Sequence, residues 1–188
     1  MKTANTLSPR FAPAVVALHW LMAGIFVGVF AFIELRVLFA KGTEVRELFK
    51  SIHFVLGMTV LALAVLRAAL RLREAMPPIS PAPPAWQHRV AQATQLLLYA
   101  WMLAMPMAGW LLLSAEGKTV ALFGLELPAL VGKDKALATQ VKDLHQLAGR
   151  IGYGLIALHA VAALWHHRVL RDDTLLRMLQ RRLAEQRS

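Results

Sequence analysis

The chain has 188 residues, of which 57% are hydrophobic, and its mean hydropathy is +0.51. This composition excludes an ordinary soluble domain and indicates an integral membrane protein. The chain has no cysteine, which excludes disulfides, iron–sulfur clusters and thiolate-ligated metal cofactors. The net charge of +10 would suggest nucleic-acid binding in a soluble protein, but its distribution is better explained by membrane orientation, so we expect no nucleic-acid partner.

Four apolar runs follow one another along the chain, and each has about the length that a helix needs to cross the hydrocarbon of a bilayer. We predict helices at 14–36, 50–72, 90–113 and 142–167, followed by a tail at 168–188. A helix satisfies its own backbone polar groups, which lipid cannot do. The sequence therefore predicts an all-α, integral membrane four-helix bundle that forms one domain over residues 1–188.

The positive charges predict the orientation of this bundle. The N-terminal segment, the stretch from Arg67 to Arg89 and the tail after His167 together hold twelve Lys and Arg residues against four acidic residues. The two outer stretches, 34–50 and 114–143, hold eight against seven. Because loops rich in Lys and Arg stay in the cytoplasm, we expect both termini to be cytoplasmic.

Histidines occur at matched depths in these helices. His19 and His159 each lie near the cytoplasmic end of a helix, whereas His53 and His145 begin helices that start on the outer side. His145 and His159 are 14 residues apart on one helix, so their rings share a face about 21 Å apart. An imidazole inside a bilayer is costly, which makes each of these residues a functional candidate.

The matched depths predict two haem sites, because an electron-transferring b-type haem takes two axial imidazoles from facing helices. His19 and His159 would ligate an inner haem, and His53 and His145 an outer one. The alternative is that these histidines only contact the lipid headgroup region, or that the bundle carries no cofactor. A metal site built from one histidine cluster is disfavoured because the predicted helices bring no carboxylates to these histidines.

The fourth helix also carries a stripe of small residues on its histidine face. Gly152 and His166 continue the seven-residue spacing of His145 and His159, and Gly149 lies one turn before Gly152. We expect the two glycines to leave room for flat macrocycles near the backbone. The alternative is that they mark plain helix packing.

The ordered set of motifs resembles the bacterial di-haem cytochrome b561 family across nearly the whole chain. In chain order, the resembling features are His19-Trp20, His53 with Gly57, Arg67-x3-Arg71 followed by Pro77-Pro78, Tyr99, Pro106, Gly109-Trp110, His145, Leu158-His159-Ala160, His166-His167 and the segment 173–178. One departure is that Gln92 and Gln95 stand where members often carry histidines.

The resemblance implies that the same four histidines bind two haem b groups in a multi-pass protein of the bacterial inner membrane. The likeness is closest to members of the superoxide oxidase type, which oxidise superoxide at the periplasmic face and reduce ubiquinone, and it would make the chain an oxidoreductase. Another one-electron donor could replace superoxide. The alternative is a haem-carrying membrane anchor that passes electrons between the quinone pool and a redox partner protein, a separate dehydrogenase or hydrogenase.

Six further residues are interpreted through this function, and for all of them except Arg67 the alternative is contact with the headgroup region or with interfacial solvent. Near the outer haem, the cations Arg36 and Lys142 would attract the superoxide anion. The side chains of Arg67 and Arg150 would pair with haem propionates. At the inner end, His166 and His167 would bind and protonate a quinone.

Overall fold

The structure is a computed structural model that describes residues 11–73 and 78–179. Four long helices account for most of this part of the chain. In order, the elements are α1 (Pro13–Leu35), the short 3-10 helix η1 (Arg36–Leu38), α2 (Glu44–Arg73), α3 (Ala85–Ala115), β1 (Val120–Leu122), β2 (Leu125–Leu127), α4 (Lys135–Trp165), the π-helical turn η2 (His166–Leu170) and α5 (Leu176–Leu179).

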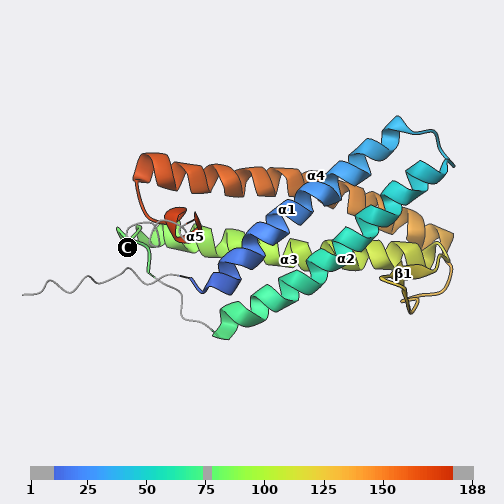
Figure 1. The fold of residues 1–188 in the computed structure, drawn as a ribbon, viewed down its shortest axis with the longest axis horizontal. Helices are drawn as coiled ribbons and strands as arrows, with labels where there is room; N and C mark the ends of the chain where they lie inside the picture. Colours follow the sequence, from blue (N-terminus) through green and yellow to red (C-terminus); the bar gives the residue numbers. More distant parts are fainter. Residues whose placement is uncertain (1–10, 74–77, 180–188) are drawn as a thin grey trace, which may run out of the picture.

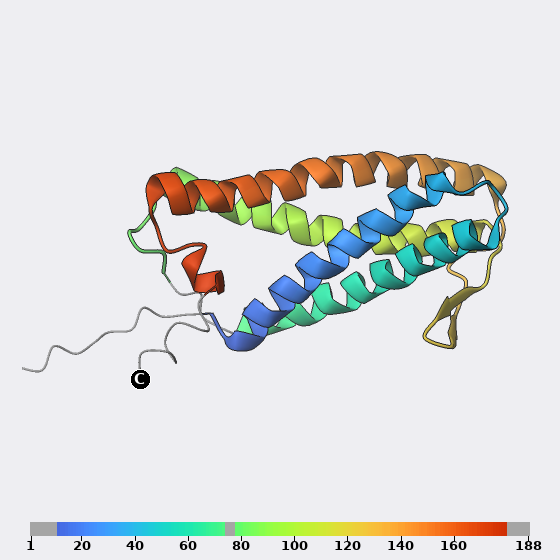
Figure 2. The same cartoon turned by 45° about the horizontal axis from the view of Figure 1, so that its top comes forward.

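The helices form two antiparallel hairpins that cross at a slant, α1 with α2 and α3 with α4 (Figures 1 and 2). Close backbone contacts join α1 to α2, α2 to α3 and α3 to α4, whereas α4 approaches the backbones of α1 and α2 at few points. Phe11 and Arg177 lie against each other at one end, with 5.3 Å between the guanidinium carbon and the ring centroid. We call this the inner end and the opposite end the outer end, following the orientation expected from the loop charges.

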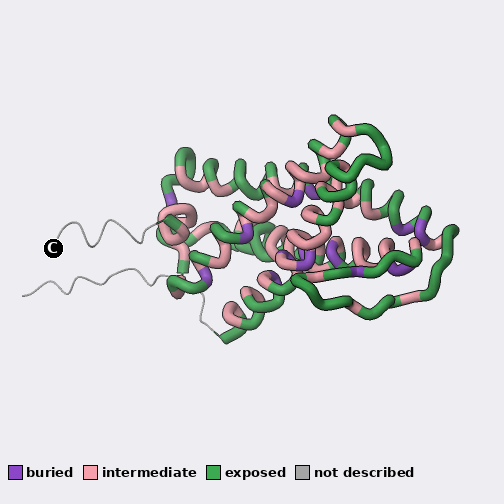
Figure 3. The backbone as a smooth tube through the Cα atoms, turned by 45° about the vertical axis from the view of Figure 1, so that its right-hand side comes forward, coloured by how far each residue is buried: buried purple, intermediate pink, exposed green. Residues whose placement is uncertain are grey.

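All four helices are long and apolar enough to cross a membrane. Most of their outward-facing residues are exposed, while the buried residues lie between the helices (Figure 3). Large apolar side chains such as Val27, Leu72 and Leu96 stand on this exposed surface. A surface of this kind suits lipid, and these features confirm the predicted all-α membrane bundle.

Three helices begin earlier than the apolar runs predicted. The structure begins α2 at Glu44, α3 at Ala85 and α4 at Lys135, rather than near 50, 90 and 142. The prediction followed hydropathy, but polar first turns are stabilised by other means. The carboxylate of Asp134 accepts hydrogen bonds from the first backbone N–H groups of α4, and Glu44 lies in the first turn of α2, where the helix dipole favours an acid.

The outer loop contains a two-stranded hairpin that the sequence analysis did not predict. Strands β1 and β2 pair antiparallel, and Val120 at the start of β1 is buried. Phe123 and Gly124 form the turn with φ values of 50° and 83°, which is the left-handed geometry that two-residue hairpins require. A pair of three-residue strands is too short for periodicity to reveal it.

The centre of the bundle is packed with apolar side chains from three helices. Met22 and Val29 of α1, Val60 and Ala64 of α2 and Met102 of α3 form one buried cluster. No residue of α4 belongs to this buried set among the described residues. The fourth helix therefore packs against α3 along its backbone, but it meets α1 and α2 mainly through side chains that span the gap.

Trp101 is one of these side chains and corrects an expectation about Gly152. Its indole nitrogen donates to the carbonyl of Ala148 on α4 at 2.9 Å. Its ring lies so close to Gly152 that a Cβ built there would be 2.1 Å from an indole carbon. The space beside Gly152 that was predicted to admit a macrocycle is occupied by this indole.

This contact predicts a difference between two glycines of α4. Gly152→Ala must displace the indole of Trp101, whereas a Cβ at Gly154 meets nothing within 4 Å. Each substitution gains about 1 kcal/mol of helix propensity. The difference between the two variants in free energy of unfolding therefore isolates the cost of overpacking at Gly152, about 1–3 kcal/mol. Thermal unfolding in detergent should therefore show Gly152→Ala as the less stable variant; equal stabilities would contradict the packing described here.

Candidate functional site

The four histidines singled out in the sequence meet as two pairs. The rings of His53 on α2 and His145 on α4 have centroids 6.3 Å apart and planes inclined at 82°. The rings of His19 on α1 and His159 on α4 have centroids 6.1 Å apart and planes inclined at 72°. We call these the outer pair and the inner pair. Both bridge α4 to helices whose backbones it otherwise approaches at few points.

The spacing of the rings suits two imidazoles on opposite sides of one metal ion. A metal–nitrogen bond is about 2 Å, and a ring nitrogen is about 1 Å from the ring centre, so the centroids of two such ligands lie about 6 Å apart. Both observed separations match this value. The described residues contain no group of three or more His, Cys, Asp or Glu that could hold a metal ion by themselves. Each pair therefore suits a metal whose remaining ligands come from a prosthetic group.

The outer pair is held by a backbone hydrogen bond and a close glycine. His53 Nδ1 lies 2.8 Å from the carbonyl oxygen of Val29 and donates to it, which leaves Nε2 with a free lone pair. His145 Nδ1 is buried without a hydrogen-bond partner within the described part of the chain. Gly109 of α3 faces the His145 ring, and a Cβ there would lie 3.6 Å from its Cε1. His145 also lines an apolar pocket of about 280 Å³ between α3 and α4.

The inner pair lies beside a cation and a phenol on neighbouring helices. Arg67 of α2 is close enough to His19 and His159 to interact electrostatically with both. Its guanidinium carbon is 6.0 Å from the ring centroid of Tyr99 on α3. Arg67 Nε and the Tyr99 hydroxyl are both buried without hydrogen-bond partners in the described residues. Two unsatisfied polar groups at this level form a place for an acceptor such as a carboxylate.

Aromatic rings fill the space between the two pairs. Phe30 of α1 contacts Tyr153 of α4 with centroids 4.2 Å apart, and it stacks on Trp101 at 6.3 Å. Phe26 completes the group, 5.7 Å from Trp101. The Tyr153 hydroxyl donates to Glu34 at 3.0 Å. Trp101 rests on Gly152, which is midway between His145 and His159 in the sequence. The packed aromatic rings therefore lie between the outer and inner histidine pairs.

The two outer cations proposed from the sequence are placed differently. Arg36 donates to the carbonyl of Ile33 and lies near enough to act electrostatically on His53. Lys142 is exposed one turn before His145 and forms no ion pair within the described ranges. Arg150 is exposed as well and has no polar contact in this part of the chain. Of the two Arg residues predicted to pair with propionates, Arg67 is therefore the one placed beside a histidine pair.

The two inner histidines are also distinguished by the structure. His166 Nδ1 lies 2.5 Å from a carboxylate oxygen of Asp172, which is almost fully buried. His167 is half-buried and has no hydrogen bond among the described residues. Neither Asp172 nor Trp101 was among the site residues predicted from the sequence. A sequence signal for Asp172 does exist, because an Asp side chain often accepts the backbone N–H two residues later in a turn. Here the Asp172 carboxylate accepts the N–H of Thr174.

Comparison with known proteins adds independent information. Residues 10–181 match the family model described as prokaryotic cytochrome b561. The chain is 37% identical over 174 residues to cytochrome b561 homolog 1 of Escherichia coli K12, covering 92% of this chain and 98% of the relative. It is 34% identical over 167 residues to the probable superoxide oxidase CybB of Yersinia pestis, covering 89% and 94%. It is 30% identical over 181 residues to cytochrome b562 of Cereibacter sphaeroides, covering 94% and 99%.

These matches imply haem b, and the described residues fit such a group. The paired rings have the spacing of two axial ligands, and the His53 hydrogen bond to Val29 is the kind that orients a metal-binding imidazole. The unpartnered polar atoms of Arg67 and Tyr99 suit a propionate beside the inner pair.

The paired arrangement predicts which haem each histidine holds. Replacing His159 or His19 with alanine should remove the inner haem and leave the outer one, and replacing His53 or His145 should do the reverse, because each iron loses one of its two protein ligands. Haem quantification per polypeptide in the purified variants measures this. His88, which belongs to neither pair, is the control, and His88→Ala should retain the full haem content. Full haem retention in His159→Ala would overturn the assignment.

Proposed function

The chain belongs to the prokaryotic cytochrome b561 family of membrane electron-transfer proteins, and from this membership we propose that it is a di-haem superoxide:ubiquinone oxidoreductase. It would take electrons from superoxide at the periplasmic face of the bacterial inner membrane and deliver them to ubiquinone in the membrane. The 34% identity to a relative named as a probable superoxide oxidase supports this choice of donor. Haem b supplies a one-electron redox centre when it is bound.

The separation of the ring centroids in the two histidine pairs carries this proposal. Values of 6.1 and 6.3 Å at both levels are what two ligands of one metal require, and they recur in two pairs that share α4. Packing of histidines against lipid headgroups gives no reason for such a repeat. His19 with His159 and His53 with His145 would hold the two haem b groups, and a haem held by two protein imidazoles would supply one-electron transfer rather than dioxygen binding.

The chain's own residues prepare the path between the two levels. Four aromatic side chains pack against one another between the two levels: Phe26, Phe30, Trp101 and Tyr153. The hydrogen bond from His53 to Val29 fixes the ring that faces His145. At the inner level, Arg67 and Tyr99 offer donors to an anionic group.

The two ends of the bundle would serve the two substrates. Arg36 and Lys142 present positive charge beside the outer pair and would raise the local concentration of the superoxide anion. At the inner end, His166 would hydrogen-bond a quinone oxygen and supply a proton. The balance is two superoxide anions, one quinone and two protons giving two dioxygen molecules and one quinol.

The purified, haem-loaded chain should consume superoxide rapidly when a short-chain ubiquinone analogue is present. Superoxide loss and quinol formation should occur in a ratio of two to one, because each superoxide yields one electron. Stopped-flow absorbance measures both. Loss no faster than spontaneous dismutation would sink the proposal and favour the membrane-anchor alternative, in which a dehydrogenase or hydrogenase supplies the electrons.

The outer cations predict a dependence on salt. Arg36→Gln and Lys142→Gln should each lower the second-order rate constant for superoxide severalfold and flatten its dependence on ionic strength, because the attraction of an anion is screened by salt. Lys118→Gln is the control, since Lys118 at the same end is paired with Glu116 at 2.6 Å. An equal effect in all three variants would show that net charge rather than position matters.

A further inference from the structure

The chain reverses direction at the inner end of α4 through an unusual backbone. The helix widens into the π-helical turn η2, and Arg171 follows it with a left-handed φ of 54°. The backbone N–H of Asp172 then donates to the carbonyl of His166 at 3.2 Å. Single π turns occur frequently at functional sites, and a left-handed Arg is sterically costly. This geometry carries the Asp172 carboxylate back to the ring of His166.

Asp172 and His166 form a buried dyad. His166 Nδ1 is 2.5 Å from Asp172 Oδ2, and the Asp172 side chain is only 4% exposed. The other oxygen, Oδ1, accepts the backbone N–H of Thr174 at 2.9 Å. Burial acts to raise the pKa of Asp172, but the hydrogen bonds from His166 and Thr174 outweigh it, so the pKa is lowered and the group remains a carboxylate. A carboxylate so placed fixes the tautomer and orientation of an imidazole.

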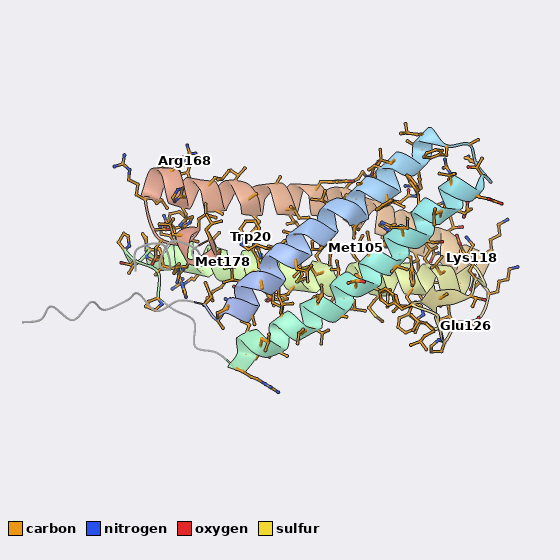
Figure 4. The ribbon with its side chains drawn as sticks, viewed as in Figure 1. Trp20, Met105, Lys118, Glu126, Arg168 and Met178 are labelled. Atoms are coloured by element: carbon orange, nitrogen blue, oxygen red, sulfur yellow. The ribbon has the colours of Figure 1, made fainter. Side chains whose placement is uncertain are left out.

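The segment 166–179, which we call the C-terminal strap, is docked on the rest of the inner end. Asp173 exchanges two hydrogen bonds with the backbone of Ser80, one of them through its carboxylate. The indole nitrogen of Trp20 donates to the carbonyl of Met178 at 2.7 Å (Figure 4). The Trp20 ring in turn contacts His19, with centroids 5.3 Å apart. The strap is therefore joined to the inner histidine pair through Trp20.

The His166 ring is partly exposed, with 22% of its side-chain surface accessible. His166 Nε2 has no hydrogen-bond partner among the described residues. Trp165 and Val169, on the same turn, are exposed on the surface that the bundle offers to lipid. His166 lies seven residues beyond His159, or about 10 Å along the helix. A lipid-soluble molecule with a carbonyl oxygen could reach this nitrogen from the bilayer while remaining close to the inner pair.

We propose that Asp172 is the positioning residue of the quinone site, holding His166 so that Nε2 donates a proton to the quinone oxygen. The proposal rests on quinone reduction as the proposed function. A quinone that gains two electrons takes up two protons to become a quinol. His166 would give one of them as an imidazolium, breaking its Nε2–H bond as the quinol O–H forms and leaving the neutral ring with the Nδ1–H that Asp172 accepts. Nε2 would regain a proton from water at the inner end, and the second proton of the quinol would also come from water.

The test measures only the step in which quinone reoxidises the reduced haems, using the full-length, haem-loaded protein. The protein is reduced chemically and mixed with increasing concentrations of a short-chain ubiquinone analogue. Asp172→Asn and His166→Gln should each lower the limiting rate of haem reoxidation about tenfold or more, with little change in the quinone concentration that gives half of that rate. The double variant should be no slower than the slower single variant, because the two residues act as one unit.

Two controls separate the dyad from a general disturbance of the strap. Arg168 lies on the same π-helical turn and points away from the bundle (Figure 4), so Arg168→Gln should reoxidise at the wild-type rate. Both dyad variants should also keep the wild-type haem content and the wild-type rate of haem reduction by superoxide.

Each contrary outcome is informative. Wild-type rates in Asp172→Asn and His166→Gln would overturn the dyad and leave quinone reduction intact. The dyad proposal would also be overturned if only the quinone concentration for the half-maximal rate changed, because the two residues would then bind the quinone without delivering a proton. If reduced wild-type protein is not reoxidised by quinone, the proposed function itself fails, and the dyad proposal with it. If Asp172→Asn loses haem, the reoxidation rate of His166→Gln decides whether the dyad proposal holds.

Discussion

The structure depends on imidazoles placed in the apolar interior of a membrane bundle. Such a ring has lost its water, and burying a polar group without a partner costs free energy. His53 recovers one hydrogen bond from the carbonyl of Val29, but His145 Nδ1 has no partner among the described residues. Pairing the rings around one metal would replace this cost with a metal bond for each imidazole. Both pairs have the spacing that this requires.

The arrangement of the helices follows from the same requirement. Three helices supply the buried apolar cluster and pack closely in sequence, whereas α4 stands farther from α1 and α2. The histidine pairs and the aromatic group span that distance. Trp101 is central here, because its indole rests on the backbone of α4 at Gly152 and bonds to Ala148. The fourth helix thus contributes one histidine to each pair without losing its packing between them.

Much of this could be predicted from the sequence, and the remainder shows what a linear pattern lacks. Hydropathy located the four helices because lipid permits few alternatives, and matched depth identified the four histidines that meet in pairs. The first turns of α2 and α4 were missed because their stability comes from capping and charge rather than hydropathy. Gly152 was predicted to lie beside a macrocycle, but it lies beside the indole of Trp101. Spacing along one helix cannot show which side chain of a neighbouring helix packs against it.

Asp172 illustrates the same limit at the inner end. Its approach to His166 depends on a π-helical turn and a left-handed Arg171, neither of which the residue pattern predicts. The roles of Arg36, Lys142, Arg150 and His167 stay predictions. Lys142 and Arg150 are exposed, His167 has no hydrogen bond among the described residues, and Arg36 donates to a backbone carbonyl of α1. The Asp172 carboxylate, by contrast, has two partners that account for its position.

Haem quantification of the purified chain, combined with its reduced-minus-oxidised spectrum, tests the central claim most directly. Two histidine pairs with the spacing of axial ligands predict two haem b groups per polypeptide, both low-spin because each iron has two imidazoles. A chain that carries one haem or none when haem is abundant, or a high-spin spectrum, would contradict this account of the site.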